Sequence, residues 1–378
     1  MDFMRARSVA GAAAAVVVAL TASAVPAHAE TAADIMRAEL EQGVTDGYPA
    51  VLAEVRDASG VTDLAGGVAD RATKVPATAD AQVRTGSNTK PFIATVILQL
   101  AGEGKLSLDD TVDHWLPGLV TGNGNDGTKI SIRQLLNHTS GLPDYLDKAM
   151  FDDAPVHPNT QWTPEQLVKR AMTKKPTGAP GSGPTYCNTN YILAGMIIKA
   201  VTGKEPGDEV QTRIIGPLDL KGTTYPTSDP QMHGNFLHGY SIPSIWIGTP
   251  PYNDVTTLNV QSYGAAGGMV STLQDLAKFQ RALLGGKLLQ PAQQREVTTP
   301  VPASGATNGF SAGLEWFDLP CGRIWAKGGD INGFITGVLN RENGEKQVSY
   351  AVNVYSGYGP TNAQKHLYDA TQKAICAA

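Results

Sequence analysis

The stretch Ser-Asn-Thr-Lys-Pro-Phe-Ile-Ala-Thr-Val-Ile-Leu-Gln-Leu, residues 87–100, decides how the rest of the chain is interpreted. From Phe92 to Leu100 the apolar residues fall nearly all round a helical wheel, which is typical of a helix buried in the middle of a protein. Pro91 stands in the first turn, where a missing N–H costs little, and glycines after Leu100 end the helix. The stretch therefore predicts a central buried helix that begins close to Ser87.

Ser87 and Lys90 stand three residues apart at the entrance of this helix, so their side chains share a face. A serine hydroxyl is a weak nucleophile unless a base lies nearby. Desolvation and the positive end of the helix both disfavour the charged form of a lysine. A neutral Lys90 would be able to take the proton of Ser87. The alternative is a capping serine beside a solvated lysine, because one Ser-x-x-Lys is expected by chance in roughly every chain of this length.

Two further patterns follow, each occurring once. Tyr186 is the only tyrosine with asparagine two residues later, at Asn188, and Lys327 is the only lysine with glycine two residues later. Taken alone, Tyr186 fits a core position and Lys327 a surface charge. The ordered set Ser-x-x-Lys, Tyr-x-Asn, Lys-x-Gly resembles that of the penicillin-recognising serine hydrolases. A tyrosine in the second box resembles the branch with class C β-lactamases and actinomycete D-alanyl-D-alanine carboxypeptidases.

Other segments extend this resemblance over most of the chain. Residues 136–143, Leu-Asn-His-Thr-Ser-Gly-Leu-Pro, are similar to a loop of that branch, and residues 267–276 are similar to its glycine-rich entry to a helix. The placement of Cys321 and Cys376 is similar to that of actinomycete carboxypeptidases.

The resemblance implies a role for each matching catalytic position. Ser87 would attack a carbonyl carbon to form an acyl-enzyme, while Lys90 and Tyr186 share the proton transfers. The nearby cations Lys90 and Lys327 would lower the pKa of Tyr186. The backbone N–H groups of Ser87 and Asp330 would form the oxyanion hole.

The remaining positions would bind substrate. Asn188 would hydrogen-bond the substrate amide, and Lys327 would attract a substrate carboxylate. Gly328 and Gly329 would let an extended substrate lie along the strand edge. Glu315 departs from the family pattern, since similar carboxypeptidases have an arginine in that strand. Either Lys327 and Arg323 suffice for a C-terminal carboxylate, or amides, esters or amine-bearing D-amino acid substrates are preferred, or Glu315 simply faces solvent.

The order of elements predicts an α+β fold of the β-lactamase/transpeptidase type. Strand patterns around residues 48–68 and after Gly309 enclose helical patterns between them. We expect an antiparallel sheet built from both termini and flanked by helices, formed by residues 30–86 and 265–378. Residues 87–264 form a mostly helical insert, and the cleft between the two parts holds the active site.

The first 29 residues have the features of a secretory signal peptide cleaved after Ala29. Arg5 and Arg7 precede a short apolar run, and Ala27-His28-Ala29 is a small-x-small cleavage pattern. We expect a secreted monomer with no membrane span. The net charge of −5 argues against nucleic-acid binding, and the histidine spacing predicts no metal and no cofactor. An oxidising setting favours a disulfide between Cys321 and Cys376, the alternative being three free thiols.

These features together predict a secreted serine-type D-Ala-D-Ala carboxypeptidase, or a transpeptidase, that acts on cell-wall peptides and reacts with β-lactams. The first alternative is a β-lactamase, esterase, D-aminopeptidase or D-amino acid amidase on the same fold. The second is a catalytically silent binding protein.

Overall fold

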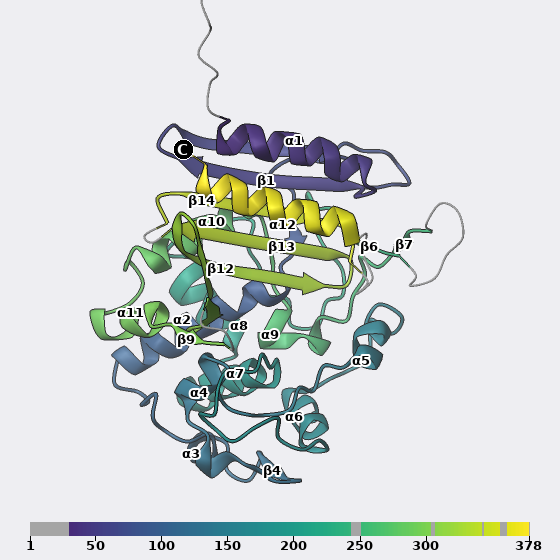
Figure 1. Cartoon of the computed structure of the whole chain (residues 1–378). Coiled ribbons are helices and arrows are strands. Elements are labelled where there is room, and N and C mark those ends of the chain that lie inside the picture. The colour runs from purple at the N-terminus through teal and green to yellow at the C-terminus, as the bar shows by residue number, and fades with distance from the viewer. Residues whose placement is uncertain (1–29, 243–250, 304–306, 342–343, 356–360, 378) are drawn as a thin grey trace, which may run out of the picture.

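A computed structural model describes residues 30–242, 251–303, 307–341, 344–355 and 361–377 (Figure 1). The predicted signal peptide, residues 1–29, lies outside the described residues. The centre of the fold is an eight-stranded sheet in which every neighbouring pair is antiparallel. In spatial order its strands are β2 (Gly60–Gly67), β1 (Ala50–Asp57), β14 (Gln347–Val352), β13 (Phe334–Arg341), β12 (Gly322–Ile331), β11 (Glu315–Leu319), β10 (Asn308–Phe310) and β9 (Val301–Pro302).

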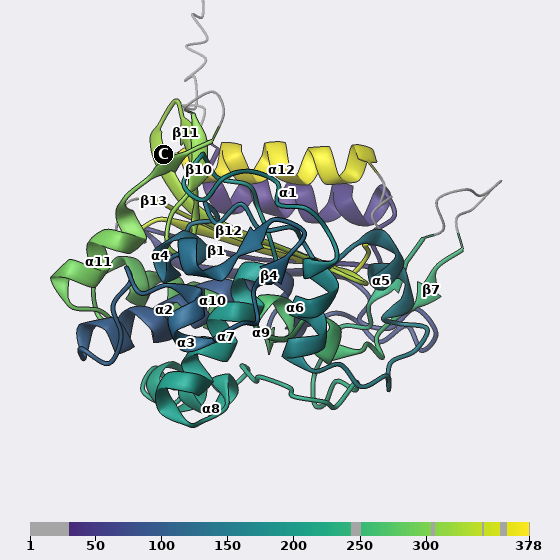
Figure 2. The same cartoon turned by 90° about the horizontal axis from the view of Figure 1, so that it is seen from below.

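Helices cover both faces of this sheet, as the alternation of side chains along β14 requires. On one face α1 (Ala32–Thr45) and α12 (Thr361–Cys376) lie side by side (Figures 1 and 2) and pack on Val348 and Val352. On the other face α10 (Leu273–Leu284) packs against β13 and β14, where Gln347 donates to the carbonyl oxygen of Ala277. The predicted α+β sheet built from both ends of the chain is confirmed.

The segment between β2 and β9 carries the remaining helices, joined by long irregular connections, and most of it lies on the α10 side of the sheet (Figure 1). Besides α10, its α-helices are α2 (Thr89–Gly102), α3 (Val112–Trp115), α4 (Ile132–Leu136), α5 (Lys148–Asp153), α6 (Pro164–Met172), α7 (Thr189–Thr202), α8 (Pro206–Val210), α9 (Gly264–Gly267) and α11 (Pro291–Thr298). Three short two-stranded ladders pair β3 (Val83–Arg84) with β8 (Val270–Ser271), β4 (Thr121–Gly122) with β5 (Asn125–Asp126), and β6 (Tyr240–Ser241) with β7 (Asn253–Asp254).

The predicted central helix is α2. Every residue from Thr89 to Leu98 is buried, and its apolar side chains form the middle of the largest hydrophobic cluster of the described chain. Phe92 stacks on Phe279 of α10, with ring centroids 3.7 Å apart, so α2 is anchored to the layer that covers the sheet.

A one-turn 3₁₀ helix, η1 (Gly86–Asn88), leads into α2 and packs directly on β12. Two glycines permit this close approach. A Cβ on Gly86, which has φ of +51°, would lie 2.9 Å from the carbonyl oxygen of Asp330, and a Cβ on Gly329 would lie 2.0 Å from that of Thr85. The contact places Ser87 beside Asp330, in the part of β12 that continues past its pairing with β11 and so forms a free edge of the described sheet.

The cysteines are arranged as predicted. Cys321, in the turn between β11 and β12, forms a disulfide with Cys376 at the end of α12. Cys187 is buried as a free thiol, and burial raises its pKa to about 12, so it stays protonated at neutral pH.

Candidate active site

A pocket of about 620 Å³ lies where the sheet edge meets the helical layer. Ser87 opens into it beside Ala266 and Gly267 of α9. The remaining described lining comes from the start of α7, from β10 to β12, and from an aromatic group: Tyr186, Asn188, Asn308, Gly309, Phe310, Glu315, Trp316, Phe317, Lys327, Gly328, Asp330, Leu146, Phe151, Tyr263, Tyr355 and Tyr368.

Ser87, Lys90 and Tyr186 meet at this pocket, although Tyr186 is 99 residues away from Ser87 in the sequence. The Ser87 Oγ lies 2.9 Å from the Lys90 Nζ and 2.5 Å from the Tyr186 hydroxyl. The tyrosine ring packs against His138, with centroids 4.6 Å apart, and against Phe310, with centroids 6.0 Å apart. The nucleophile candidate therefore has two proton-transfer groups within hydrogen-bonding distance.

Lys90 is completely buried, and loss of hydration, followed by the charge of Lys327, holds its pKa well below the ordinary value for lysine. Its Nζ lies 2.8 Å from Asn188 Oδ1, 2.7 Å from the carbonyl oxygen of Ala266 and 2.9 Å from Ser87 Oγ. A neutral amine has two N–H donors and one lone pair. Two of these neighbours can only accept, so the lone pair faces the Ser87 hydroxyl and is placed to take its proton.

The structure corrects the expected ionisation of Tyr186. Burial, its largest influence, raises the pKa of Tyr186 well above the ordinary value, and Glu315 and Asp144 act in the same direction. The two lysines do lie over its ring, with Nζ atoms 4.9 Å (Lys90) and 5.1 Å (Lys327) from the centroid, but they do not outweigh desolvation. Tyr186 is therefore a neutral phenol that can pass a proton on, while Lys90 is the candidate base.

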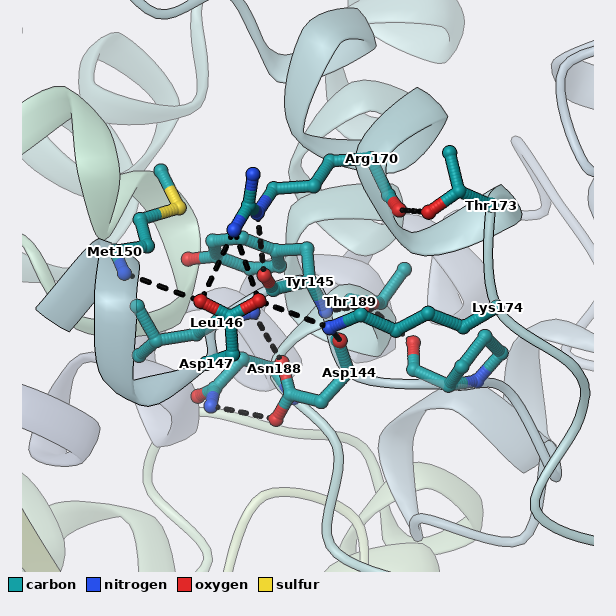
Figure 3. Close-up of polar contacts among 11 residues, drawn as sticks. Asp144, Tyr145, Leu146, Asp147, Met150, Arg170, Thr173, Lys174, Asn188 and Thr189 are labelled. Carbon is teal, nitrogen blue, oxygen red and sulfur yellow. Dashed lines mark hydrogen bonds and ion pairs between the residues drawn. The ribbon is translucent and has the colours of Figure 1, made fainter.

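Asn188 has both ends of its side chain occupied. Its Oδ1 accepts from Lys90, and its Nδ2 donates to Asp144 Oδ2 over 2.9 Å (Figure 3). The predicted contact of Asn188 with a substrate amide requires one of these bonds to yield, although the residue does line the pocket.

Lys327 already has a carboxylate partner, because it forms an ion pair with Glu315 across the β11–β12 ladder. The Lys327 side chain is only 3 % exposed, whereas that of Glu315 is 33 % exposed and lines the pocket. The alternative that Glu315 simply faces solvent is therefore wrong.

Two further expectations need correction. Arg323 is absent from the described lining of the pocket; its guanidinium pairs with Asp318 over 2.8 Å and lies 4.2 Å above the Trp316 ring. It is four residues from Lys327 on the same strand and cannot assist it. Gly328 lines the pocket with open space beside it, but Gly329 faces the Thr85 carbonyl, so its small size serves packing rather than substrate.

The sequence patterns missed three contributors to this site: Asp144, Ala266 and Phe310. Asp144 directly follows the loop 136–143, which the resemblance did single out, so its position was available as a signal. Ala266 likewise directly precedes the segment 267–276, but its contribution is a backbone carbonyl, which has no residue identity, and an isolated phenylalanine such as Phe310 is usually a core residue.

This fold and this group of side chains define a serine hydrolase. The family described as Beta-lactamase matches residues 33–372, and the chain belongs to this family.

Curated relatives include penicillin-binding protein 4* of Bacillus subtilis (strain 168), which is 29% identical over 76% of this chain and 64% of that protein. Penicillin-binding protein 4 of Amycolatopsis lactamdurans is 29% identical over 58% of this chain and 55% of that protein. The chain thus spans less than two thirds of the length of these relatives.

Solved structures are similar over almost their full length. A D-stereospecific amidohydrolase from Streptomyces sp. has a TM-score of 0.80 and 38% identity, over 89% of this chain and 97% of that one. A D-amino acid amidase from Ochrobactrum anthropi SV3, complexed with L-phenylalanine amide, has a TM-score of 0.77 and 26% identity, over 91% and 99%. No helix among the described residues is long and apolar enough to cross a membrane.

Proposed function

We propose that this protein hydrolyses the amide bond of D-amino acid amides or short peptides whose D-residue has a free α-ammonium group. The ion pair of Glu315 with Lys327 carries this proposal. A carboxypeptidase needs an unpaired cation for the substrate carboxylate, whereas here the only lysine on the described pocket wall is already neutralised.

The charges around the pocket support a cationic substrate. Glu315 and Asp330 line it with Lys327, while the buried Lys90 favours its neutral form. Partial desolvation raises the pKa of Asp330 to about 6, so Asp330 is ionised above that pH. Two carboxylates against one ammonium leave the wall negative at neutral pH, which attracts an ammonium group and repels a carboxylate.

The shape of the pocket supports an amide of a bulky residue. Phe151 lies edge-on to Tyr263 and to Tyr355, with centroids 6.4 Å and 5.8 Å apart, and forms an aromatic wall. β11 pairs with β12 only up to Ala326, so within the described sheet the β12 edge from Lys327 onward is open to an extended backbone. The D-stereospecific amidohydrolase and D-amino acid amidase structures are consistent with this choice.

We propose a reaction in two stages that uses the groups around Ser87. Ser87 Oγ bonds to the amide carbon as its proton passes to Lys90, and backbone N–H groups at Ser87 and Asp330 are the proposed donors to the oxyanion. The C–N bond breaks when Tyr186 protonates the leaving nitrogen, and Lys90 returns the proton to Tyr186. Water then attacks the acyl-enzyme with proton transfer through the same groups, and the acid leaves while Ser87 is restored.

Glu315→Gln is the decisive variant. We expect kcat/KM for D-phenylalanine amide to fall about 10- to 100-fold, because the neutral amide no longer attracts the ammonium group, while N-acetyl-D-phenylalanine amide is unaffected. The matched control is Asp318→Asn on the same strand, since that carboxylate faces Arg323. Equal losses for both substrates would contradict the role of Glu315.

The carboxypeptidase function is the second candidate, favoured by the similarity to penicillin-binding proteins and by Lys327 at the pocket. Turnover of diacetyl-Lys-D-Ala-D-Ala should be far slower than turnover of D-phenylalanine amide. The opposite ranking would establish the carboxypeptidase and reject the amidase.

We propose in addition that the protein is exported and cleaved after Ala29, on the pattern of residues 1–29. The protein recovered from culture medium should begin at Glu30, and intracellular accumulation of the uncleaved chain would contradict export.

A further inference from the structure

We propose that Asp144 is a positioning residue of this active site, which fixes the end of the Asn188 amide that faces Lys90. Asp144 lies behind Asn188 and is not part of the described pocket lining. Its effect on the reaction is therefore transmitted through Asn188 and does not depend on which substrate the pocket accepts.

The Asp144 carboxylate is surrounded by donors (Figure 3). Its Oδ2 accepts from the Asn188 backbone N–H over 3.0 Å and from Asn188 Nδ2 over 2.9 Å. Its Oδ1 accepts from the Leu146 N–H over 2.9 Å. A carboxylate is an acceptor on both oxygens, so it satisfies all three bonds. An asparagine in its place would turn an NH₂ group toward one of these N–H donors.

The segment that carries Asp144 is held in place from α6 and from the residues just after it. Arg170 binds both oxygens of Asp147, at 3.0 and 2.8 Å, and donates to the Tyr145 carbonyl at 3.2 Å. Lys174 donates to the Asp144 carbonyl at 2.6 Å (Figure 3). Because its backbone is fixed on both sides, the Asp144 carboxylate has a defined position against Asn188.

This arrangement decides how Lys90 uses its lone pair. While Asp144 holds Nδ2, Asn188 presents Oδ1 to Lys90, so Lys90 donates to Asn188 and keeps its lone pair for Ser87. A flipped Asn188 would instead donate from Nδ2 to that lone pair and compete with the Ser87 proton. The geometry therefore links the orientation of one amide to the availability of the base.

Asp144 also acts on Lys90 by its charge. Burial and Lys327 lower the pKa of Lys90, whereas Asp144 and Glu315 oppose that shift. The titratable and charged groups that face Lys90 come from five parts of the fold: Lys327 of β12, Glu315 of β11, Asp144 and His138 of the loop after α4, Tyr186 and Cys187 before α7, and Tyr191 of α7.

The test is the pH dependence of Ser87 acylation by p-nitrophenyl acetate, whose reaction does not require an ammonium group. Asp144→Asn should lower the acylation rate about 10- to 100-fold at the pH optimum, because the base is misoriented. The acid limb of the pH–rate profile reports the deprotonation of Lys90. Loss of a negative neighbour lowers the pKa of Lys90, so the midpoint of that limb should move to lower pH.

Asp147→Asn is the matched control, since it removes the contacts with Arg170 and Lys174 without touching Asn188. It should leave the acid limb in place. One combined result would overturn the proposal: Asp144→Asn loses rate, the acid limb of its pH profile stays in place, and its melting temperature falls by the same amount as in this control.

Two additional variants keep the test decisive. Asp144→Glu retains an acceptor-only carboxylate and should retain more acylation activity than Asp144→Asn. In an Asn188→Ala background, Asp144→Asn should cause no further loss of rate at the pH optimum, because there is no amide left to orient, and only the shift of the acid limb caused by the lost charge should remain. Fully additive losses would show that Asp144 does not act through Asn188.

Discussion

At the scale of single residues, the protonation of the site is set mainly by burial. Lys90 is completely buried with two obligatory acceptors at its Nζ, and its pKa falls. Tyr186 is half-buried, and desolvation, with Glu315 and Asp144 acting in the same direction, raises its pKa. Both shifts favour the neutral form, so the Ser87 hydroxyl meets an amine and a phenol rather than an ammonium and a phenolate.

Replacing Lys90 by methionine tests this assignment. The methionine side chain is of similar length but has no amine lone pair that could take the Ser87 proton, so kcat/KM should fall about 10²- to 10⁴-fold. The melting temperature should hold or rise, because a desolvated amine is removed from the interior. Ser87→Ala serves as the comparison, since it should abolish covalent labelling by a fluorescent penicillin; a Lys90→Met enzyme with normal rates would refute the base.

At the scale of elements, the site depends on the contact of η1 with β12. That contact brings the start of α2 to the sheet edge, and Thr336 of β13 reinforces it by donating to the Thr85 carbonyl at 3.0 Å. Gly329 is the residue whose lack of a side chain allows the approach. The position of Ser87, the candidate nucleophile, is therefore a property of strand packing and not of α2 alone.

Gly329→Ala should destabilise this contact by about 1–3 kcal/mol, because its Cβ would overlap the Thr85 oxygen and force η1 away from β12. Gly328→Ala is the matched comparison, since a Cβ there meets no atom within 4 Å. Urea denaturation should show a loss only for Gly329→Ala. Equal stabilities for the two variants would show that η1 does not require this glycine.

At the scale of the whole molecule, the sheet and the helical layer on it are each built from segments that are distant in sequence. The first and last described helices, α1 and α12, lie together on a sheet whose strands come from both ends of the chain (Figure 2). The disulfide from Cys321 to Cys376 joins the β11–β12 turn, near the strands that carry Glu315 and Lys327, to the end of α12.

The disulfide should contribute to global stability through the loop it closes. A separation of 55 residues corresponds to roughly 4 kcal/mol in the chain-entropy account. The double variant Cys321→Ser/Cys376→Ser should have a lower free energy of unfolding than the oxidised wild type, and reduction of the wild type should lower it too. The double variant should itself be insensitive to reductant; a wild type whose denaturation midpoint ignores reductant would contradict the prediction.

Much of the site could be predicted from sequence, because local spacing and ordered motifs are properties of the chain itself. The three-residue interval placed Ser87 and Lys90 on one helical face, and the ordered boxes singled out Tyr186 and Lys327 before any geometry was known. The alternation of strand and helix patterns likewise predicted the α+β sheet.

Only the tertiary structure decided which side chains from different elements pair with each other. Sequence patterns left three interpretations of Glu315 open and gave Arg323 a role at the substrate. In the folded chain the β11–β12 register places Arg323 opposite Asp318, and Glu315 forms an ion pair with Lys327, which lies just beyond that ladder. From the sequence we expected a lowered pKa for Tyr186, whereas burial raises it. Desolvation depends on how many neighbours cover a group, and spacing along the chain does not report this. Spacing along the chain reports which side chains share an element, whereas charge pairing and burial depend on distances between elements, which only the folded packing sets.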